Sequence, residues 1–209
     1  VPNAAGPATA RPESEARQLM QRATEILERS GSKRESMDSA SELANRAVGL
    51  DSTDEEVLGP AARIDAWMIY MGYDRSAERR QQAQQRAARA MALAPDSHAA
   101  RWARAVVFAF ADGSPAMLIE GERILRSLAA ESGNKSVFTD LGTVLRDENK
   151  FGEAAVVFER ADDPASAGWN YLSAHRIDDA RRMALALPRR PDALNLRIAI
   201  EWWGAEDLT

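Results

Sequence analysis

The sequence predicts an all-α protein made of stacked helical hairpins, and three observations lead to this prediction. A ladder of small residues recurs with a period of roughly 35 residues, which is typical of stacked helix pairs. Alanine and arginine are abundant while β-branched residues are scattered singly, and this composition favours helix. No segment alternates apolar and polar residues for long enough to predict a strand. The ladder positions are Ala40, Ala44 and Ala47; Ala83, Ala87 and Ala90; and Ala154, Phe158 and Ala161.

The first four helices follow from apolar stripes and from the residues at their ends. A helix over 12–29 is closed by Gly31, because a glycine just past the last apolar position commonly ends a helix. The acidic residues of 51–56 suit the start of the third helix, where the helix dipole favours negative charge. That helix contains Pro60, which removes a hydrogen bond, so we expect the helix to begin at or near Pro60 or to bend there. The other two helices are predicted over 33–50 and 76–93.

Turn residues divide the rest of the chain. Pro115 suits the first turn of a helix, and Gly133 ends that helix. Pro188 and Pro191 bracket the turn before the last helix. About eleven helices result in all. Those after the first four are predicted over 97–111, 115–131, 136–148, 151–161, 165–175, 178–187 and 192–203.

Composition limits the class of protein. Of the 209 residues 45% are hydrophobic and 28% are charged, which is the balance of an ordinary folded protein. The net charge of −5 argues against a nucleic-acid partner, which more often binds a basic surface. The longest strongly apolar run, 105–111, is too short to cross a bilayer. With no cysteine there is no disulfide or thiolate metal site, and both a cytoplasmic and an exported location remain open.

The first residues differ in composition from the rest. Residues 1–11 are rich in proline, alanine and glycine, and the chain begins at Val1 rather than at methionine. We expect a disordered tail over 1–11, of the kind that follows a signal peptide or an interdomain boundary. The repeat domain is predicted over 12–209.

One hairpin carries a recognisable spacing of large and small residues. It reads Phe138-x2-Leu141-Gly142-x2-Leu145, followed by Ala154-x3-Phe158-x2-Ala161. This pattern resembles the tetratricopeptide repeat (TPR), and weaker copies begin at Trp67 and Trp102. The resemblance implies a right-handed α-α superhelix, a TPR-like solenoid of about five helical hairpins plus a C-terminal helix. We expect the large aromatic residues of these copies to lie in the core.

Motifs for catalysis are not found in the sequence. His98 and His175 are the only histidines and are far apart, and no phosphate-binding loop or serine-hydrolase motif occurs. We therefore expect a protein that is not an enzyme and that has no cofactor, no metal and no catalytic residue.

Two groups of arginines have two interpretations each. A charged run on a helix is usually its solvated face, but either group could also bind phosphate or an acidic peptide. The first group is Arg75, Arg79, Arg80, Arg86 and Arg89; the second is Arg181, Arg182, Arg189 and Arg190.

The leading functional hypothesis is a non-enzymatic scaffold that binds a protein or peptide. In the family that the chain resembles, the first helices of successive hairpins line a concave groove, and the ladder residues lie on the second helices. We expect the partner to contact the opposite face of the first helices, without nucleic acid and without membrane insertion. The groove residues are Asp65, Met68, Ala103, Val107, Phe110, Thr139, Thr143, Arg146, Trp169 and Asn170.

Two alternatives come from other classes. The chain could be the sensor or interaction half of a larger bacterial regulator with an upstream effector domain. It could also self-assemble into a homo-oligomer through its last helix, where Trp202 and Trp203 are the candidate contact residues. Terminal repeats normally present a polar outer face, and two adjacent tryptophans depart from that rule. The apolar face of this helix includes Leu196, Ile198 and Ile200, and we expect it to be covered by the preceding hairpin, by residues beyond this sequence or by another copy.

Overall fold

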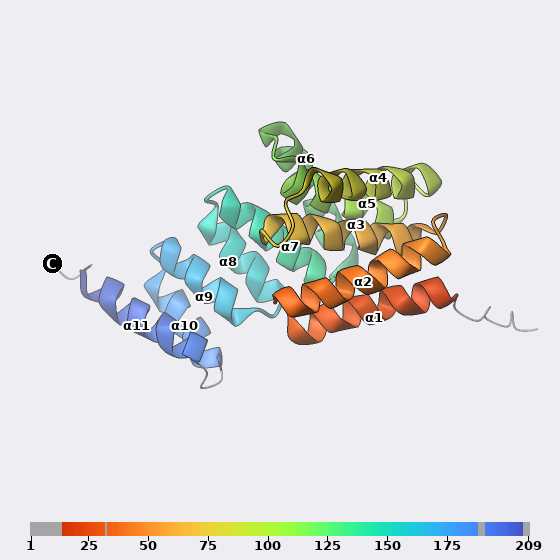
Figure 1. The fold of residues 1–209 in the computed structure, drawn as a ribbon. Coiled ribbons are helices and arrows are strands. Elements are labelled where there is room, and N and C mark those ends of the chain that lie inside the picture. The colour runs from red at the N-terminus through yellow and green to blue at the C-terminus, as the bar shows by residue number, and fades with distance from the viewer. Residues whose placement is uncertain (1–13, 32, 188–190, 207–209) are drawn as a thin grey trace, which may run out of the picture. The chain divides into compact units, whose positions relative to one another are not determined.

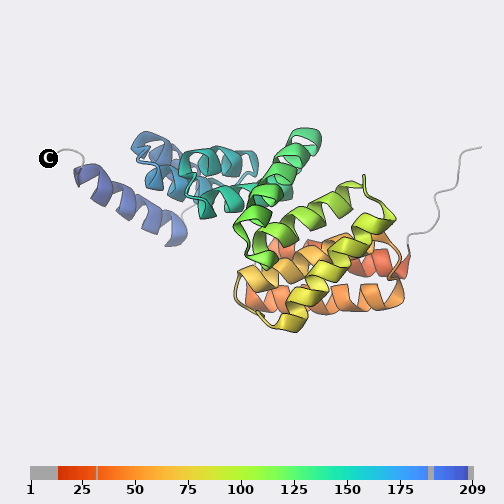
Figure 2. The same ribbon diagram turned by 90° about the horizontal axis from the view of Figure 1, so that it is seen from above.

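The computed structural model describes residues 14–31, 33–187 and 191–206, and within the last helix the side chains of 194–202. These residues form eleven α-helices and one π-helical segment, which confirms the all-α prediction (Figures 1 and 2). The tail predicted over 1–11 and the side chain of Trp203 lie outside the described residues. The helices are α1 (Glu15–Ser30), α2 (Arg34–Leu50), α3 (Glu55–Tyr70), α4 (Ala77–Leu93), α5 (His98–Val107), η1 (Phe108–Asp112), α6 (Pro115–Ser132), α7 (Lys135–Asp147), α8 (Phe151–Arg160), α9 (Pro164–Ser173), α10 (Ile177–Ala186) and α11 (Pro191–Glu206).

The chain divides into two compact units, residues 1–103 and residues 104–209, and the boundary falls inside α5. In the first unit, α1 packs against α2 and α3 against α4 as hairpins, and α2 also contacts α3. In the second unit, successive helices from α6 to α11 pack against one another along the chain. The sequence prediction of a single repeat domain over 12–209 stays a prediction.

Local signals explain where the helices of the first unit begin and end. The Ser14 hydroxyl accepts a hydrogen bond from the backbone N–H of Arg17 at the start of α1. Gly31 ends that helix with a positive φ of 68°, a conformation that glycine adopts without steric cost. The expectation that the third helix begins near Pro60 was wrong, because α3 begins at Glu55 and Pro60 lies inside it. Asp54 caps α3, so the helix starts at its cap rather than at its proline.

The alanine ladders lie in the core, as the sequence predicts. Ala40, Ala44 and Ala47 of α2 are buried together with Leu19 and Met37. Ala83, Ala87 and Ala90 of α4 are buried as well. Small side chains at these spacings allow neighbouring helices to approach closely.

Two helices of the first unit approach each other closely at Gly59 of α3. A Cβ atom placed there would lie 2.9 Å from the carbonyl oxygen of Ala99 on α5, which is backbone and cannot rotate away. We expect Gly59→Ala to lower the free energy of unfolding by about 1–3 kcal/mol, because the two helices must move apart. The measurement is urea denaturation followed by circular dichroism.

Gly49 of α2 is the matched control for this prediction. A Cβ atom there would meet nothing within 4 Å, so Gly49→Ala gains helix propensity without a clash. That change should raise stability by up to about 1 kcal/mol. Equal effects of the two substitutions would contradict the steric argument.

In the second unit, the helix predicted over 97–111 is not a uniform α-helix. It changes to a π-helix over Phe108–Asp112 and ends at Gly113 with φ 77°. Gly121 of α6 is adjacent to this change: a Cβ atom on it would lie 2.8 Å from the carbonyl oxygen of Ala105 and 3.3 Å from the backbone nitrogen of Ala109. The hydrophobic pattern of the sequence did not reveal this change from α-helix to π-helix. Phe110 and Ala111 are buried in the π-helix, so apolar residues stand at buried positions on both sides of the change.

The hairpin of α7 and α8 has the packing that its spacing predicts. Three ring atoms of Phe158 lie 3.0 Å from where a Cβ of Gly142 would be, so the phenyl ring covers the backbone of α7. Phe138 is also buried, in the first turn of α7. The alignment of Trp67 with Phe138 was wrong, because Trp67 lies in the last turn of α3. The two copies share the ladder of the second helix but not the register of the first.

Candidate partner-binding surface

The predicted groove residues of the first unit are buried rather than exposed. Asp65 and Met68 of α3 and Ala103 of α5 each expose 3% of their surface or less. The expectation that these three side chains face a partner was wrong. A physical reason is visible for Asp65, which is surrounded by cations of its own chain.

Asp65 is the centre of an ion-pair cluster that connects three helices. Its Oδ1 accepts a hydrogen bond from Nη1 of Arg79 at 2.6 Å, and its Oδ2 accepts one from Nη1 of Arg86 at 2.7 Å. Both arginines come from α4 and also donate to α2: Arg79 to Oγ of Ser41 at 2.9 Å and Arg86 to Oδ1 of Asn45 at 2.7 Å. We call these five residues the Asp65 cluster.

Burial and hydrogen bonding shift the pKa values of two carboxyl groups in this region, Asp65 and Asp74, in opposite directions. Burial raises the pKa of the Asp65 carboxyl, and the guanidiniums of Arg86 and Arg79 counteract that shift. Asp74, close to the surface, accepts hydrogen bonds from the hydroxyl and the backbone N–H of Ser76, which lower its pKa to about 2. Asp74 also binds Nε of Arg79 at 3.0 Å, so it holds that arginine from the solvent side.

The first arginine group therefore has two kinds of members. Arg79 and Arg86 form ion pairs with the buried Asp65 of the same chain. The interpretation of the whole group as a solvated face was therefore wrong for these two arginines. A signal was present in the sequence, because Arg79, Ala83 and Arg86 follow one another at helical spacing on the ladder side of α4. Arg89 is exposed.

The histidine at the start of α5 is packed against aromatic and cationic neighbours. The rings of His98 and Trp102 meet edge to face, with their centroids 5.7 Å apart. The guanidinium of Arg63 on α3 lies over the Trp102 ring, with its Cζ 3.2 Å from the ring centroid. A cavity of about 150 Å³ lies beside these side chains. Trp102 is buried, so its predicted place in the core is confirmed.

The predicted groove residues of the second unit differ in exposure. Val107, Phe110, Thr143 and Asn170 are buried, and their prediction as exposed contacts was wrong. Thr143 donates its hydroxyl hydrogen to the carbonyl oxygen of Thr139 at 2.8 Å, so its polar group is used within α7. The side chains that reach the surface are Thr139, Arg146 and Trp169.

Trp169 is the large apolar side chain that α9 exposes. Its exposed fraction is 42%, whereas Tyr171 and Leu172 beside it are buried. Gly168 fixes the orientation of the helix, because a Cβ there would meet Leu196 and Met183. Trp169 follows Gly168 in the sequence as Thr143 follows Gly142, but Thr143 is buried whereas Trp169 is exposed.

Asn170 provides a buried acceptor next to Trp169. Its Nδ2 donates to the carbonyl oxygen of Ser166 at 2.8 Å, while its buried Oδ1 has no hydrogen-bond partner in the described part of the chain. Since successive residues of a helix are 100° apart, Asn170 lies on the side of α9 opposite Gly168. An N–H donor would satisfy this oxygen.

A second cluster of hydrogen-bonded side chains connects α9 to α8 and α10. Tyr171 donates its hydroxyl hydrogen to Glu159 of α8, and Arg182 of α10 donates to both carboxylate oxygens of Glu159 at 2.9 Å. Arg182 lowers the pKa of Glu159, and burial raises the pKa of Tyr171. Arg182 is thus an internal contact, whereas Arg189 and Arg190 of the same predicted group lie outside the described residues.

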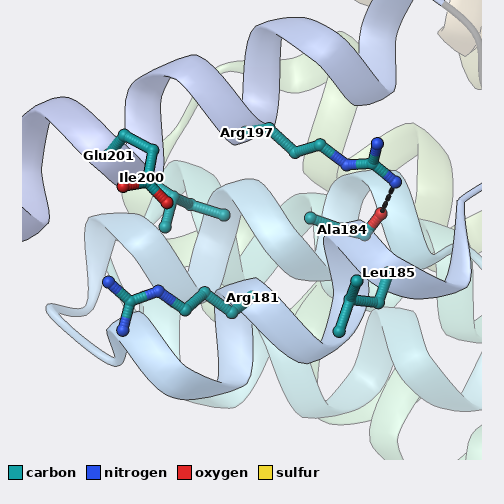
Figure 3. A pocket seen from close by; sticks show the side chains of 6 residues that line it. All are labelled: Arg181, Ala184, Leu185, Arg197, Ile200 and Glu201. Atoms are coloured by element: carbon teal, nitrogen blue, oxygen red, sulfur yellow. Dashed lines mark hydrogen bonds between the residues drawn. The ribbon is translucent and has the colours of Figure 1, made fainter.

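The apolar residues of α11 are divided between two faces. Leu196 and Ile200 are buried, while Ile198 is exposed, so the prediction that these three form a single face was wrong. Residues two apart on a helix point in nearly opposite directions. Figure 3 shows the cavity of about 380 Å³ between α10 and α11. It is lined by Arg181, Ala184, Leu185, Arg197, Ile200 and Glu201.

Two further searches of the described residues concern metals and membranes. Within 14–31, 33–187 and 191–206 there is no group of three or more histidine, aspartate or glutamate side chains that could hold a metal ion. No helix in this part of the chain is long and apolar enough to cross a membrane.

Comparison with known proteins identifies the fold. No protein-family model matches the chain, and no curated protein matches it in sequence. The structure is similar to TTC0263, a thermophilic TPR protein of Thermus thermophilus, with a TM-score of 0.61 and 16% identity over 90% of this chain and 98% of that one. It is also similar to PilF of Pseudomonas aeruginosa, with a TM-score of 0.53 and 14% identity over 92% of this chain and 90% of that one. The chain thus has a TPR-like fold, as the spacing of its hairpins predicts.

Proposed function

We propose that this protein is a non-enzymatic scaffold that binds a protein or peptide through the exposed face of α7 and α9. The observation that carries the proposal is Trp169, a large aromatic side chain left accessible on a helix whose neighbouring positions are buried. Tryptophan is strongly enriched among the residues that dominate binding energy at protein interfaces. The TPR-like fold supports the proposal, since stacked hairpins offer extended surfaces for partners.

The polar groups around Trp169 define the chemistry of the partner. Arg146 at the end of α7 provides positive charge at the surface, next to Asp147, whose Oδ1 lies 3.3 Å from its Nε. The unpartnered Oδ1 of Asn170 is buried, so a partner at the surface does not reach it and it is not part of the proposed contact. We therefore propose a segment with one apolar side chain for Trp169 and an acidic residue toward Arg146.

Selection of peptides tests this proposal without knowledge of the natural partner. Random peptides displayed on phage are selected on the wild-type protein, and the affinity of the enriched peptides is measured by fluorescence anisotropy. We expect Trp169→Ala to weaken binding by about tenfold or more, because a central aromatic contact is lost.

Ile119→Ala is the matched control. Ile119 is also a large exposed apolar side chain of the same unit, but it lies on α6, outside the proposed binding face of α7 and α9. This variant should bind the selected peptides as the wild type does. Peptides that bind equally well to the wild type and to the Trp169 variant would contradict the proposed surface.

A further inference from the structure

The last described helix has apolar side chains on two opposite faces. Leu196 and Ile200 expose 2% or less, on the side of α11 that packs against α9 and α10. On the other side Leu194 exposes 58%, Ile198 55% and Trp202 73% of its surface. These three residues are four apart and form one stripe along α11, the blue helix of Figure 1. We call them the α11 stripe.

A further large apolar side chain is exposed on α10. Leu185 of α10 exposes 79% of its surface at the rim of the cavity in Figure 3. Folded monomers rarely expose several large apolar side chains together, and such patches mark interaction sites. The α11 stripe is therefore a candidate interaction surface.

Charged residues beside the stripe indicate what its occupant is. Arg197 and Glu201 lie on the same edge of α11, toward α10. The Nη2 of Arg197 donates to the carbonyl oxygen of Ala184 at 3.1 Å, and a guanidinium has further N–H donors for a carboxylate. One edge of α11 thus carries one positive and one negative charge. An antiparallel copy of the same edge presents these two charges in the opposite order, so each charge can meet one of opposite sign.

We propose that a second copy of this chain covers the α11 stripe, with the two α11 helices antiparallel about a two-fold axis at Ile198. In a two-fold interface, if residue i of one copy contacts residue j of the other, then j also contacts i, and only a residue on the axis meets its own counterpart. Ile198 then packs on Ile198, and Leu194 of each copy packs beside Trp202 of the other. The large and the medium side chains alternate, so the two stripes interlock.

The same arrangement pairs the charges. The two-fold axis keeps the Arg197 and Glu201 edges of both helices on one side. Arg197 of one copy and Glu201 of the other are then offset by two residues, about 3 Å along the axis. Both ion pairs form at once, whereas a partner helix with only acidic residues would meet Glu201 with like charge. Charge complementarity therefore favours a second copy.

Sedimentation equilibrium over a concentration series tests the proposal. The wild type should associate reversibly from monomer to dimer. Ile198→Glu places two carboxylates at the two-fold axis and should weaken association by about a hundredfold or more. Ile119→Glu makes the same change on the exposed face of α6 and should leave association unaltered.

A mixing experiment separates the interface from the stability of each variant. Arg197→Glu and Glu201→Arg each create like-charge contacts between identical copies, so each variant alone should associate about tenfold more weakly than the wild type. An equimolar mixture should regain association, because each copy then supplies the charge that the other needs. Loss of folding cannot produce this recovery, and circular dichroism of each variant checks the helix content.

Three results would overturn the proposal. The first is a wild type that stays monomeric at all concentrations, including one that binds a helix of a different protein at the stripe. The second is a dimer that Ile198→Glu leaves intact, since its interface would lie elsewhere. The third is a mixture of the two folded charge variants that associates no better than either alone.

Discussion

Replacing Asp65 by alanine should lower the free energy of unfolding by about 3–5 kcal/mol. The carboxylate is 1% exposed and binds two guanidiniums that are themselves largely covered. Removing one partner of a buried ion pair leaves an uncompensated charge in a poorly solvated place, and this desolvation dominates the cost. Here Arg86 loses its anion and Arg79 keeps only Asp74. Urea denaturation followed by circular dichroism at neutral pH measures the difference.

Asp38→Ala is the control for this prediction, because Asp38 is an acid on α2 whose partner Arg34 is also exposed, at 3.6 Å. Exposed pairs of this kind contribute little, so the control should lie within about 0.5 kcal/mol of the wild type. A loss of less than about 1 kcal/mol for the Asp65 variant would show that Arg79 and Arg86 reach water when the acid is removed.

Replacing Phe158 by alanine should cost about 3–5 kcal/mol in the second unit. The ring is 2% exposed and lies directly on Gly142 of α7, which has no side chain of its own to fill the space. The cost combines the lost transfer of the ring from water with the cavity that remains. The measurement is again the free energy of unfolding in urea.

Val156→Ala provides the comparison on the same helix, since Val156 is 45% exposed and its truncation leaves no cavity. It should change stability by no more than about 0.5 kcal/mol. If the two α8 variants were equally stable, the contact between Phe158 and Gly142 would not hold the hairpin together.

The helices could be predicted from the sequence because their signals are local. Ser76 caps α4, and Pro115 stands in the first turn of α6, as their residue types indicate. Gly142 and Phe158 could be paired because a repeat places them at a known spacing. In each case the information lies within one hairpin.

The candidate site was less predictable, because exposure depends on which elements meet. Asp65 was expected on a groove, yet its cations come from the following helix and its other neighbours from the preceding hairpin. The opposite error occurred at Ile198, which was grouped with Leu196 and Ile200 although it points the other way. Only Trp169, Arg146 and Thr139 of the predicted groove reach the surface, and their role in binding stays a prediction.

The Asp65 cluster has a consequence for how the first hairpins recognise each other. Alanine stripes are alike, and one stripe fits against another in several registers. A buried carboxylate has no such tolerance: if α4 slid by one turn, about 5.4 Å, Arg79 and Arg86 would no longer both reach Asp65, Ser41 and Asn45. The cluster therefore penalises every pairing of α2, α3 and α4 except the native one.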